Sequence, residues 1–229
     1  MDTLKSIRTL DQDKIDIVNQ LLLPHTIEYV QILTIEHAHD AIKSMKVLLF
    51  SLLSPVPLTS VQIRGAPAIG ALASLSIATT LSSAVKATPR PEFLATPSAL
   101  EAYIAPQLDY LFTARPTAVN LGAATRRLAK LLSQAVTAHQ QQPEPRTADA
   151  DAALAIANDL IAEAKLIGGE DKAQNIAMSK LGGDWLHKRI AGSGEYLNVL
   201  TVCNTGSLAT SVIFDAVLLV LHRLLTLLD

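Results

Sequence analysis

The sequence predicts a mainly helical α/β protein, in which a helical N-terminal domain with a small antiparallel strand pair is followed by the first strand of an α/β domain. Three patterns lead to this fold class. Several stretches place apolar residues at the three- and four-residue spacing of helices, residues 19–35 hold two short β-branched runs, and residues 197–202 have the composition of a buried strand. Since 49% of the 229 residues are hydrophobic, the chain can bury a core without disulfides or metals.

The N-terminal part is predicted to hold the strand pair and one helix. The two apolar runs within residues 19–35 favour a hairpin or a pair of short strands. A helix is expected next, with Ala41 and Ile42 on its apolar face. Residues 47–60 are apolar, uncharged and interrupted by prolines, and they form an atypical insertion.

Helices are predicted along most of the remaining chain. Residues 67–85 form a buried helix entered through a proline, residues 99–111 form a second helix, and an amphipathic helix starts near Pro116 and Thr117.

Two further helices are expected after a polar, proline-broken connection. Asp149 or Asp151 would cap the first of them. The first helix would end at the glycine pair 168–169 and the second at the glycine pair 182–183.

Composition excludes several classes of partner. Lys and Arg number 19 against 21 Asp and Glu, so the chain lacks the basic excess that nucleic-acid binding needs. His222 and Arg223 split the apolar C-terminal run into pieces too short to span a membrane. The chain has one cysteine, Cys203, which excludes an internal disulfide and fits a reducing compartment, and no secretory signal is visible. We therefore expect a soluble chain in the cytoplasm, and also in the nucleus.

Two arginines stand at predicted helix entrances. Residues 64–67 (Arg-Gly-Ala-Pro) lead into the buried helix, and Arg115 precedes Pro116. Free N–H groups at a helix N-terminus, together with guanidinium groups, favour a phosphate. The alternatives are a capping turn with a solvated arginine, and two unrelated surface arginines.

A third candidate site is the polar turn of residues 201–207. Cys203 follows the predicted strand and precedes a predicted helix start, where its thiolate would be stabilised. Asn204, Thr205 and Ser207 offer hydrogen bonds to a polyol. The alternative is a small buried cysteine without reactivity.

A metal site was weighed at Glu36, His37, His39 and Asp40. Imidazoles two residues apart on a helix point to different sides, so a solvated helix start is favoured and no metal is expected.

Residues 61–78, 114–121 and 201–210 together resemble the methylthioribose-1-phosphate isomerase family, which shares a superfamily with regulatory subunits of translation initiation factor 2B. The resemblance covers residues 4–46 and 61–210. It implies an intramolecular oxidoreductase of methionine salvage that interconverts 5-methylthioribose 1-phosphate and 5-methylthioribulose 1-phosphate. It also implies a homodimer that uses no metal or nucleotide cofactor.

The resemblance assigns roles to individual residues. Arg64, Gly65 and Ala66 would bind the substrate, and Arg115 would hold its phosphate or sugar. Cys203 would act beside the reacting carbons. A non-catalytic regulatory homologue and a ribose-1,5-bisphosphate isomerase are the alternatives from other classes.

The chain departs from the family pattern in its organisation. We expect a helical domain over residues 1–197 and the truncated start of a Rossmann-like domain over residues 198–229. Family members continue into that domain, which supplies an aspartate general acid, so we expect impaired activity here. Residues 47–60 and 211–229 are interpreted as translated non-coding sequence.

Overall fold

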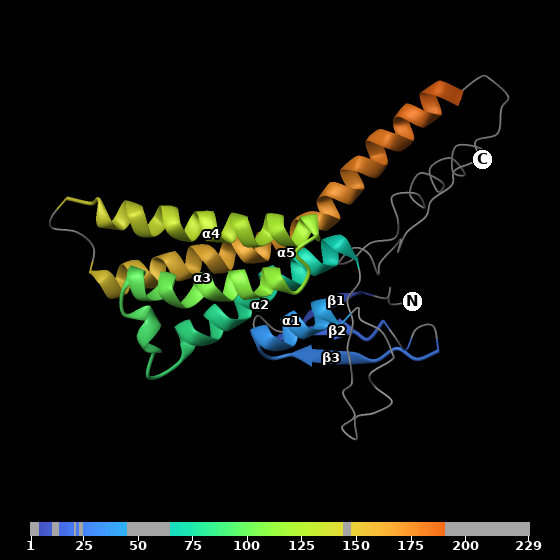
Figure 1. Ribbon diagram of the computed structural model, residues 1–229. Helices are drawn as coiled ribbons and strands as arrows, with labels where there is room; N and C mark the ends of the chain where they lie inside the picture. Colours follow the sequence, from blue (N-terminus) through green and yellow to red (C-terminus); the bar gives the residue numbers. More distant parts are fainter. Residues whose placement is uncertain are drawn as a thin grey trace.

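The computed structural model describes the chain over residues 5–10, 14–20, 22, 25–44, 65–143 and 148–190. The elements follow the order β1 (Ile7–Leu10), β2 (Lys14–Val18), β3 (Tyr29–Ile32), α1 (Ile35–Lys43), α2 (Ala66–Lys86), a short 3-10 helix (Glu92–Leu94), α3 (Pro97–Thr113), α4 (Val119–Gln140) and α5 (Asp149–Ile190). Helices therefore dominate the described residues, as predicted, and one small sheet lies beside them (Figure 1).

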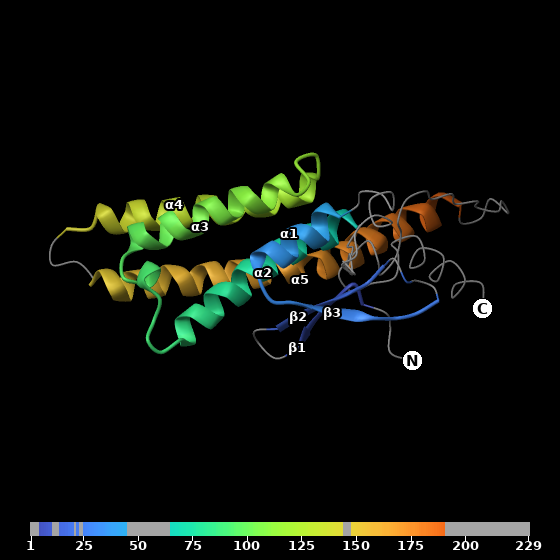
Figure 2. The same cartoon turned by 60° about the horizontal axis from the view of Figure 1, so that its bottom comes forward.

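The sheet is antiparallel and three-stranded, with β2 between β1 and β3. Ile17 pairs with Ile7 on one side and with Val30 on the other. Ile15 and Ile17 point to one face of β2 and are fully buried, because α2 packs against that strand. Figure 2 shows the sheet lying alongside α1 and α2.

The position predicted for the strand pair was partly wrong. Among the described residues of 19–35, only the stretch of β3 is a strand, and its partner β2 lies before residue 19. A third strand, β1, extends the sheet. The isoleucines of β1 and β2 account for this arrangement, since their alternation places an apolar row on the face that the helices cover.

Helix α2 is the central element of the bundle. Its Ala, Leu and Ile residues are almost all buried against α4, α5 and α1. Among the described helices, α2 alone is long and apolar enough to cross a membrane by length, and 78% of its most apolar window is buried inside the protein. Packing on several sides accounts for its lack of a polar face.

Helices α3 and α4 confirm the predicted periodicity, with one shift at an entrance. The predicted start of α4 at Pro116 was wrong, because the helix begins at Val119. Pro116 and Thr117 lie in a turn that is closed by the Ala118 N–H donating to the Arg115 carbonyl at 2.9 Å.

Helix α5 is continuous, so the two predicted helices are one. The glycine pair 168–169 does not end it, and the pair 182–183 also lies within it. A β-carbon at Gly168 would lie 2.9 Å from Leu75 of α2, so this glycine serves close helix packing rather than termination. The predicted cap was also wrong, because Asp149 and Asp151 both lie inside the first helical turn.

Two predicted regions lie outside the described residues. They are residues 45–64, with the atypical insertion and Arg64, and residues 191–229, with the predicted strand, the Cys203 turn and the predicted start of a second domain.

Candidate functional site

The entrance of α2 is built from the Gly-Ala-Pro part of the first motif. Gly65 is the N-cap in an extended conformation, and its carbonyl accepts the first helical hydrogen bond from the Ile69 N–H at 2.9 Å. Ala66 is the first helical residue and Pro67 follows it, with a fixed φ that suits the first turn. Within the described structure, no side chain caps this end, and the first turn holds no acidic residue.

The entrance of α4 lies next to the second motif. The half-buried Arg115 begins the turn that leads to the N-cap Ala118, whose carbonyl accepts from the Gly122 N–H at 3.1 Å. Among the residues described, no side chain caps α4 either, and its first turn also lacks an acid.

The other α-helices of the described structure begin differently. In α1, the Thr34 hydroxyl accepts from the His37 N–H at 3.2 Å, and in α3 the Thr96 hydroxyl accepts from the Ala99 N–H at 3.1 Å. Helix α5 carries Asp149 and Asp151 in its first turn. The two helices that follow the sequence motifs are therefore the ones whose positive ends are left for an external anion.

The structure brings these two entrances together at one end of the bundle (Figure 1). A β-carbon at Gly70 of α2 would lie 2.9 Å from the main-chain oxygen of Asn120 of α4. A cavity of about 200 Å³ lies beside this contact, with Pro67 from α2, Asn120 from α4 and Gln174 from α5 among its lining residues. The motifs are 50 residues apart between Gly65 and Arg115, yet the helices that follow them meet; neither of these two residues lines the cavity itself.

Arg127 of α4 fixes the α5 side of this cavity. Its two terminal nitrogens each donate to a carboxylate oxygen of Glu170 at 2.8 Å, and its Nε donates to Glu163. Hydrogen bonds from Arg127 hold the pKa of Glu170 below its ordinary value, while the bonds to Glu170 and Glu163 raise the pKa of Arg127. The Arg127 charge is thus already matched by two carboxylates.

The cavity is consequently polarised. Its α5 wall carries Glu170 and Asp171, which repel an anion, whereas the α2 and α4 walls present helix N-termini. A ligand with a phosphate at one end and hydroxyl groups at the other would match this polarity, with the phosphate toward the two helix entrances.

Three of the five site residues predicted from the sequence are described, and all three stand at these entrances. Gly65 and Ala66 form the start of α2, and Arg115 lies three residues before the N-cap of α4. Arg64 and Cys203 lie outside the described residues, so their predicted roles remain predictions.

Sequence reasoning missed the cavity residues Asn120, Arg127, Glu170 and Gln174. Asn120 lies within the second motif and Arg127 lies about two turns further along α4, so the helical periodicity could have pointed to them. Glu170 and Gln174 lie in the middle of α5 and have no local motif.

The residues weighed for a metal site are spread over different environments. His37 is exposed, whereas His39 is buried, stacks on Tyr110 with ring centroids 4.1 Å apart, and has Nε2 3.1 Å from the Thr113 hydroxyl. Burial and the nearby carboxylates of Asp40 and Glu36 raise the pKa of Tyr110. The described residues contain no group of three or more metal-ligating side chains.

Comparison with protein-family models identifies the family of the chain. The model of the initiation factor 2 subunit family matches residues 62–223, more than half of the sequence. The chain belongs to the initiation factor 2 subunit family. The match includes both entrance motifs and the Cys203 turn, and it continues beyond residue 210, where the resemblance noted in the sequence ends.

Curated proteins that are similar in sequence to this chain include two isomerases. A methylthioribose-1-phosphate isomerase of Laccaria bicolor is 55% identical over 91% of this chain and 48% of its own length. The isomerase of Postia placenta is 51% identical over 97% of this chain and 51% of its own length. The chain therefore spans about half the length of the curated relatives that it matches.

Solved structures of the family share the fold. The 5-methylthioribose 1-phosphate isomerase of Pyrococcus horikoshii superposes with a TM-score of 0.66 at 26% identity, over 97% of this chain and 50% of that one. Subunit delta of translation initiation factor eIF-2B from A. fulgidus gives a TM-score of 0.55 at 26% identity, over 91% of this chain and 47% of that one. The helical bundle with its small sheet is thus the N-terminal architecture expected from the sequence.

Proposed function

We propose that the protein acts as an aldose–ketose isomerase that interconverts 5-methylthioribose 1-phosphate and 5-methylthioribulose 1-phosphate. The relatives at 55% and 51% identity carry that name, whereas the likeness to the initiation factor subunit is at 26% identity. The observation that carries the proposal is the meeting of the α2 and α4 entrances, both without a side-chain cap or first-turn acid in the described structure.

The chemistry explains why such a site is needed. The reaction moves hydrogen between C1 and C2 of the sugar, and the phosphate on C1 prevents simple ring opening. The phosphate must therefore be held still while charge develops on the neighbouring carbons, which requires fixed donors in a site that excludes water.

The residues of this chain fall into two roles under this proposal. The main-chain groups of Gly65 and Ala66, with the guanidinium groups of Arg64 and Arg115, bind the phosphate end of the substrate. Cys203 acts beside the reacting carbons. The general acid is expected in the part of the relatives' length that this chain does not match.

A binding experiment and an assay together test the proposal. Calorimetric titration of the purified chain with 5-methylthioribose 1-phosphate should show saturable binding, and Arg115→Ala should weaken it about 10- to 100-fold, the loss expected for a charged hydrogen-bonding partner. Arg126→Ala is the matched control, because Arg126 is an exposed arginine about two turns inside α4, away from the helix entrance.

The assay separates the alternatives. Turnover of 5-methylthioribose 1-phosphate that disappears in Cys203→Ala would establish catalysis by this chain. Tighter binding of ribose 1,5-bisphosphate would favour a bisphosphate isomerase instead. Equal binding by the Arg115→Ala and Arg126→Ala variants would contradict the proposed phosphate site.

A further inference from the structure

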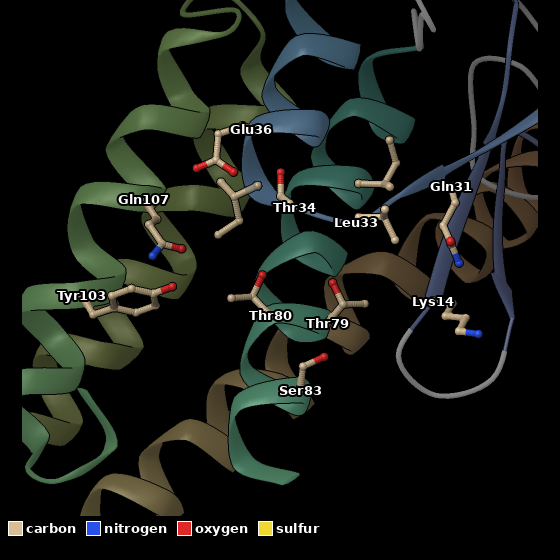
Figure 3. Close-up of a pocket in the computed structure, with 12 residues that line it drawn as sticks. Lys14, Gln31, Leu33, Thr34, Glu36, Thr79, Thr80, Ser83, Tyr103 and Gln107 are labelled. Carbon is tan, nitrogen blue, oxygen red and sulfur yellow. The ribbon is translucent and has the colours of Figure 1, made fainter. Parts of the chain in front are cut away.

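A second and larger cavity lies away from the helix entrances. It has a volume of about 510 Å³ and is bounded by the β2–β3 sheet, α1, the C-terminal half of α2, and α3 (Figure 3). Along α2, Thr80 in its wall lies 13 residues beyond Pro67, or about 20 Å at the helical rise. The two cavities are separate sites.

Of the three hydroxyl groups on the α2 wall, those of Thr79 and Thr80 donate within the helix, and the third belongs to Ser83. Thr79 Oγ1 donates to the Ser76 carbonyl at 3.0 Å, and Thr80 Oγ1 donates to the same carbonyl at 2.9 Å. Each of these two threonine oxygens therefore keeps only acceptor capacity for a molecule in the cavity.

The α1 wall adds a third acceptor. At Glu36, hydrogen bonds from its own backbone and from the Thr34 side chain lower the pKa of the carboxyl, which is ionised at neutral pH. On the α3 wall, Gln107 Oε1 has no hydrogen-bond partner among the described residues, but it is buried without accessible surface and so does not face the cavity.

The other lining residues indicate which groups a ligand would carry away from these acceptors. Ile32, Leu33 and Ile35 give the cavity an apolar side. Lys14 of β2 lies on the side opposite Glu36 and Gln107 (Figure 3). A cationic group is thus favoured near Glu36 and opposed near Lys14.

We propose that this cavity binds a small organic amine, with a primary ammonium group directed at Glu36 and the two threonine hydroxyls and with its carbon stem on the apolar side. An ammonium group brings three N–H donors and one positive charge, which matches a wall of acceptors that includes one carboxylate. The inference is independent of the isomerase proposal, because it shares no residue with the α2 and α4 entrances.

The first test compares two cations of equal charge. n-Butylammonium chloride, titrated into the full chain by calorimetry, should bind saturably, whereas N,N,N-trimethylbutylammonium, which has no N–H donor, should bind at least tenfold more weakly. Equal affinity for the two cations, or no saturable binding of n-butylammonium, would overturn the proposal.

Variants then locate the site. Glu36→Gln should weaken n-butylammonium binding at least tenfold, whereas Glu28→Gln, the same charge change at an exposed residue before β3, should leave it unchanged. Gln107→Leu should raise the thermal midpoint of the free protein, since it removes the unpaired buried oxygen, and should leave n-butylammonium binding unchanged. Lys14→Met should strengthen binding; weaker binding in Lys14→Met or unchanged binding in Glu36→Gln would contradict the assignment.

Discussion

The β-position of Gly70 in α2 faces the main-chain oxygen of Asn120 in α4 at 2.9 Å. A real β-carbon essentially never lies that close to another heavy atom, so these two helix backbones approach as closely as they do because residue 70 has no side chain. The contact joins the second turn of α2 to the first turn of α4 and sets the separation of the two entrances.

We therefore expect Gly70→Ala to lower the free energy of unfolding by about 1–3 kcal/mol, the range for overpacking a core. The neighbouring atom belongs to the backbone of α4, which cannot move aside alone. Urea unfolding followed by circular dichroism would measure the change. Gly182→Ala is the control, because nothing lies within 4 Å of its β-position, and it should not destabilise the protein.

The glycine pair in the middle of α5 offers a sharper comparison. A β-carbon at Gly168 would lie 2.9 Å from Leu75 Cδ2, whereas one at Gly169 would meet open space. Gly169→Ala should stabilise the protein by up to about 1 kcal/mol through helix propensity. Gly168→Ala should be less stable than Gly169→Ala by about 1 kcal/mol or more, and equal unfolding midpoints would show that the close packing on Leu75 carries no cost.

This pair also shows where sequence reasoning reached its limit. The apolar spacing of residues 67–85 and 99–111 predicted two helices correctly, because periodicity is a local property. Adjacent glycines are likewise a local signal for a helix end, but whether Gly168 ends a helix or packs against Leu75 depends on a contact 93 residues away in the chain. The packing of α5 on α2 overrides the local preference.

The candidate site likewise has one part that local sequence signals predict and another that depends on contacts between distant helices. The positions of Gly65, Ala66 and Arg115 near helix entrances were predictable, because a proline marks each entrance in the sequence, although α4 begins three residues after Pro116. Their roles in binding stay predictions. That two such entrances meet, with Glu170 across from them, follows from the arrangement of three helices and has no local signature.

A negative charge introduced at the α4 entrance should affect the stability of the protein and its binding of substrate in opposite directions. Val119 is the first residue of α4 and is 78% exposed, so Val119→Glu should stabilise the protein by about 0.5 kcal/mol through the helix dipole. The same carboxylate should weaken binding of 5-methylthioribose 1-phosphate several-fold, because it competes with the phosphate. Val119→Gln, which adds no charge, should do neither; calorimetry and thermal unfolding of both variants would measure the two effects.

The Arg127–Glu170 pair should give stability a defined pH dependence. The pKa of Glu170 is lowered in the folded protein, so its contribution is present above its ordinary pKa of 4.5 and is lost as the pH falls through the lowered value. Arg127→Met should cost about 1 kcal/mol at pH 7, a modest value because the pair is partly exposed.

The pH series contains its own control. The difference between Arg127→Met and the unchanged protein in urea unfolding should shrink below pH 4.5, and 1 M NaCl should also reduce it. Arg127→Lys should recover only part of the loss, since one ammonium group cannot form the two parallel bonds to Glu170. A difference that stays constant down to pH 2 would refute the electrostatic origin.

Because α5 is one continuous helix, its residue count fixes the distance and the rotation between its two ends. At 1.5 Å per residue, its 42 residues span about 63 Å, and each residue turns the helix by about 100°. One alanine inserted after Gly182 would therefore swing the direction in which the polypeptide leaves Ile190 by more than a quarter turn, while four inserted residues would nearly restore it. The number of residues in α5 thus sets both the distance and the direction of Ile190 relative to the start of the helix.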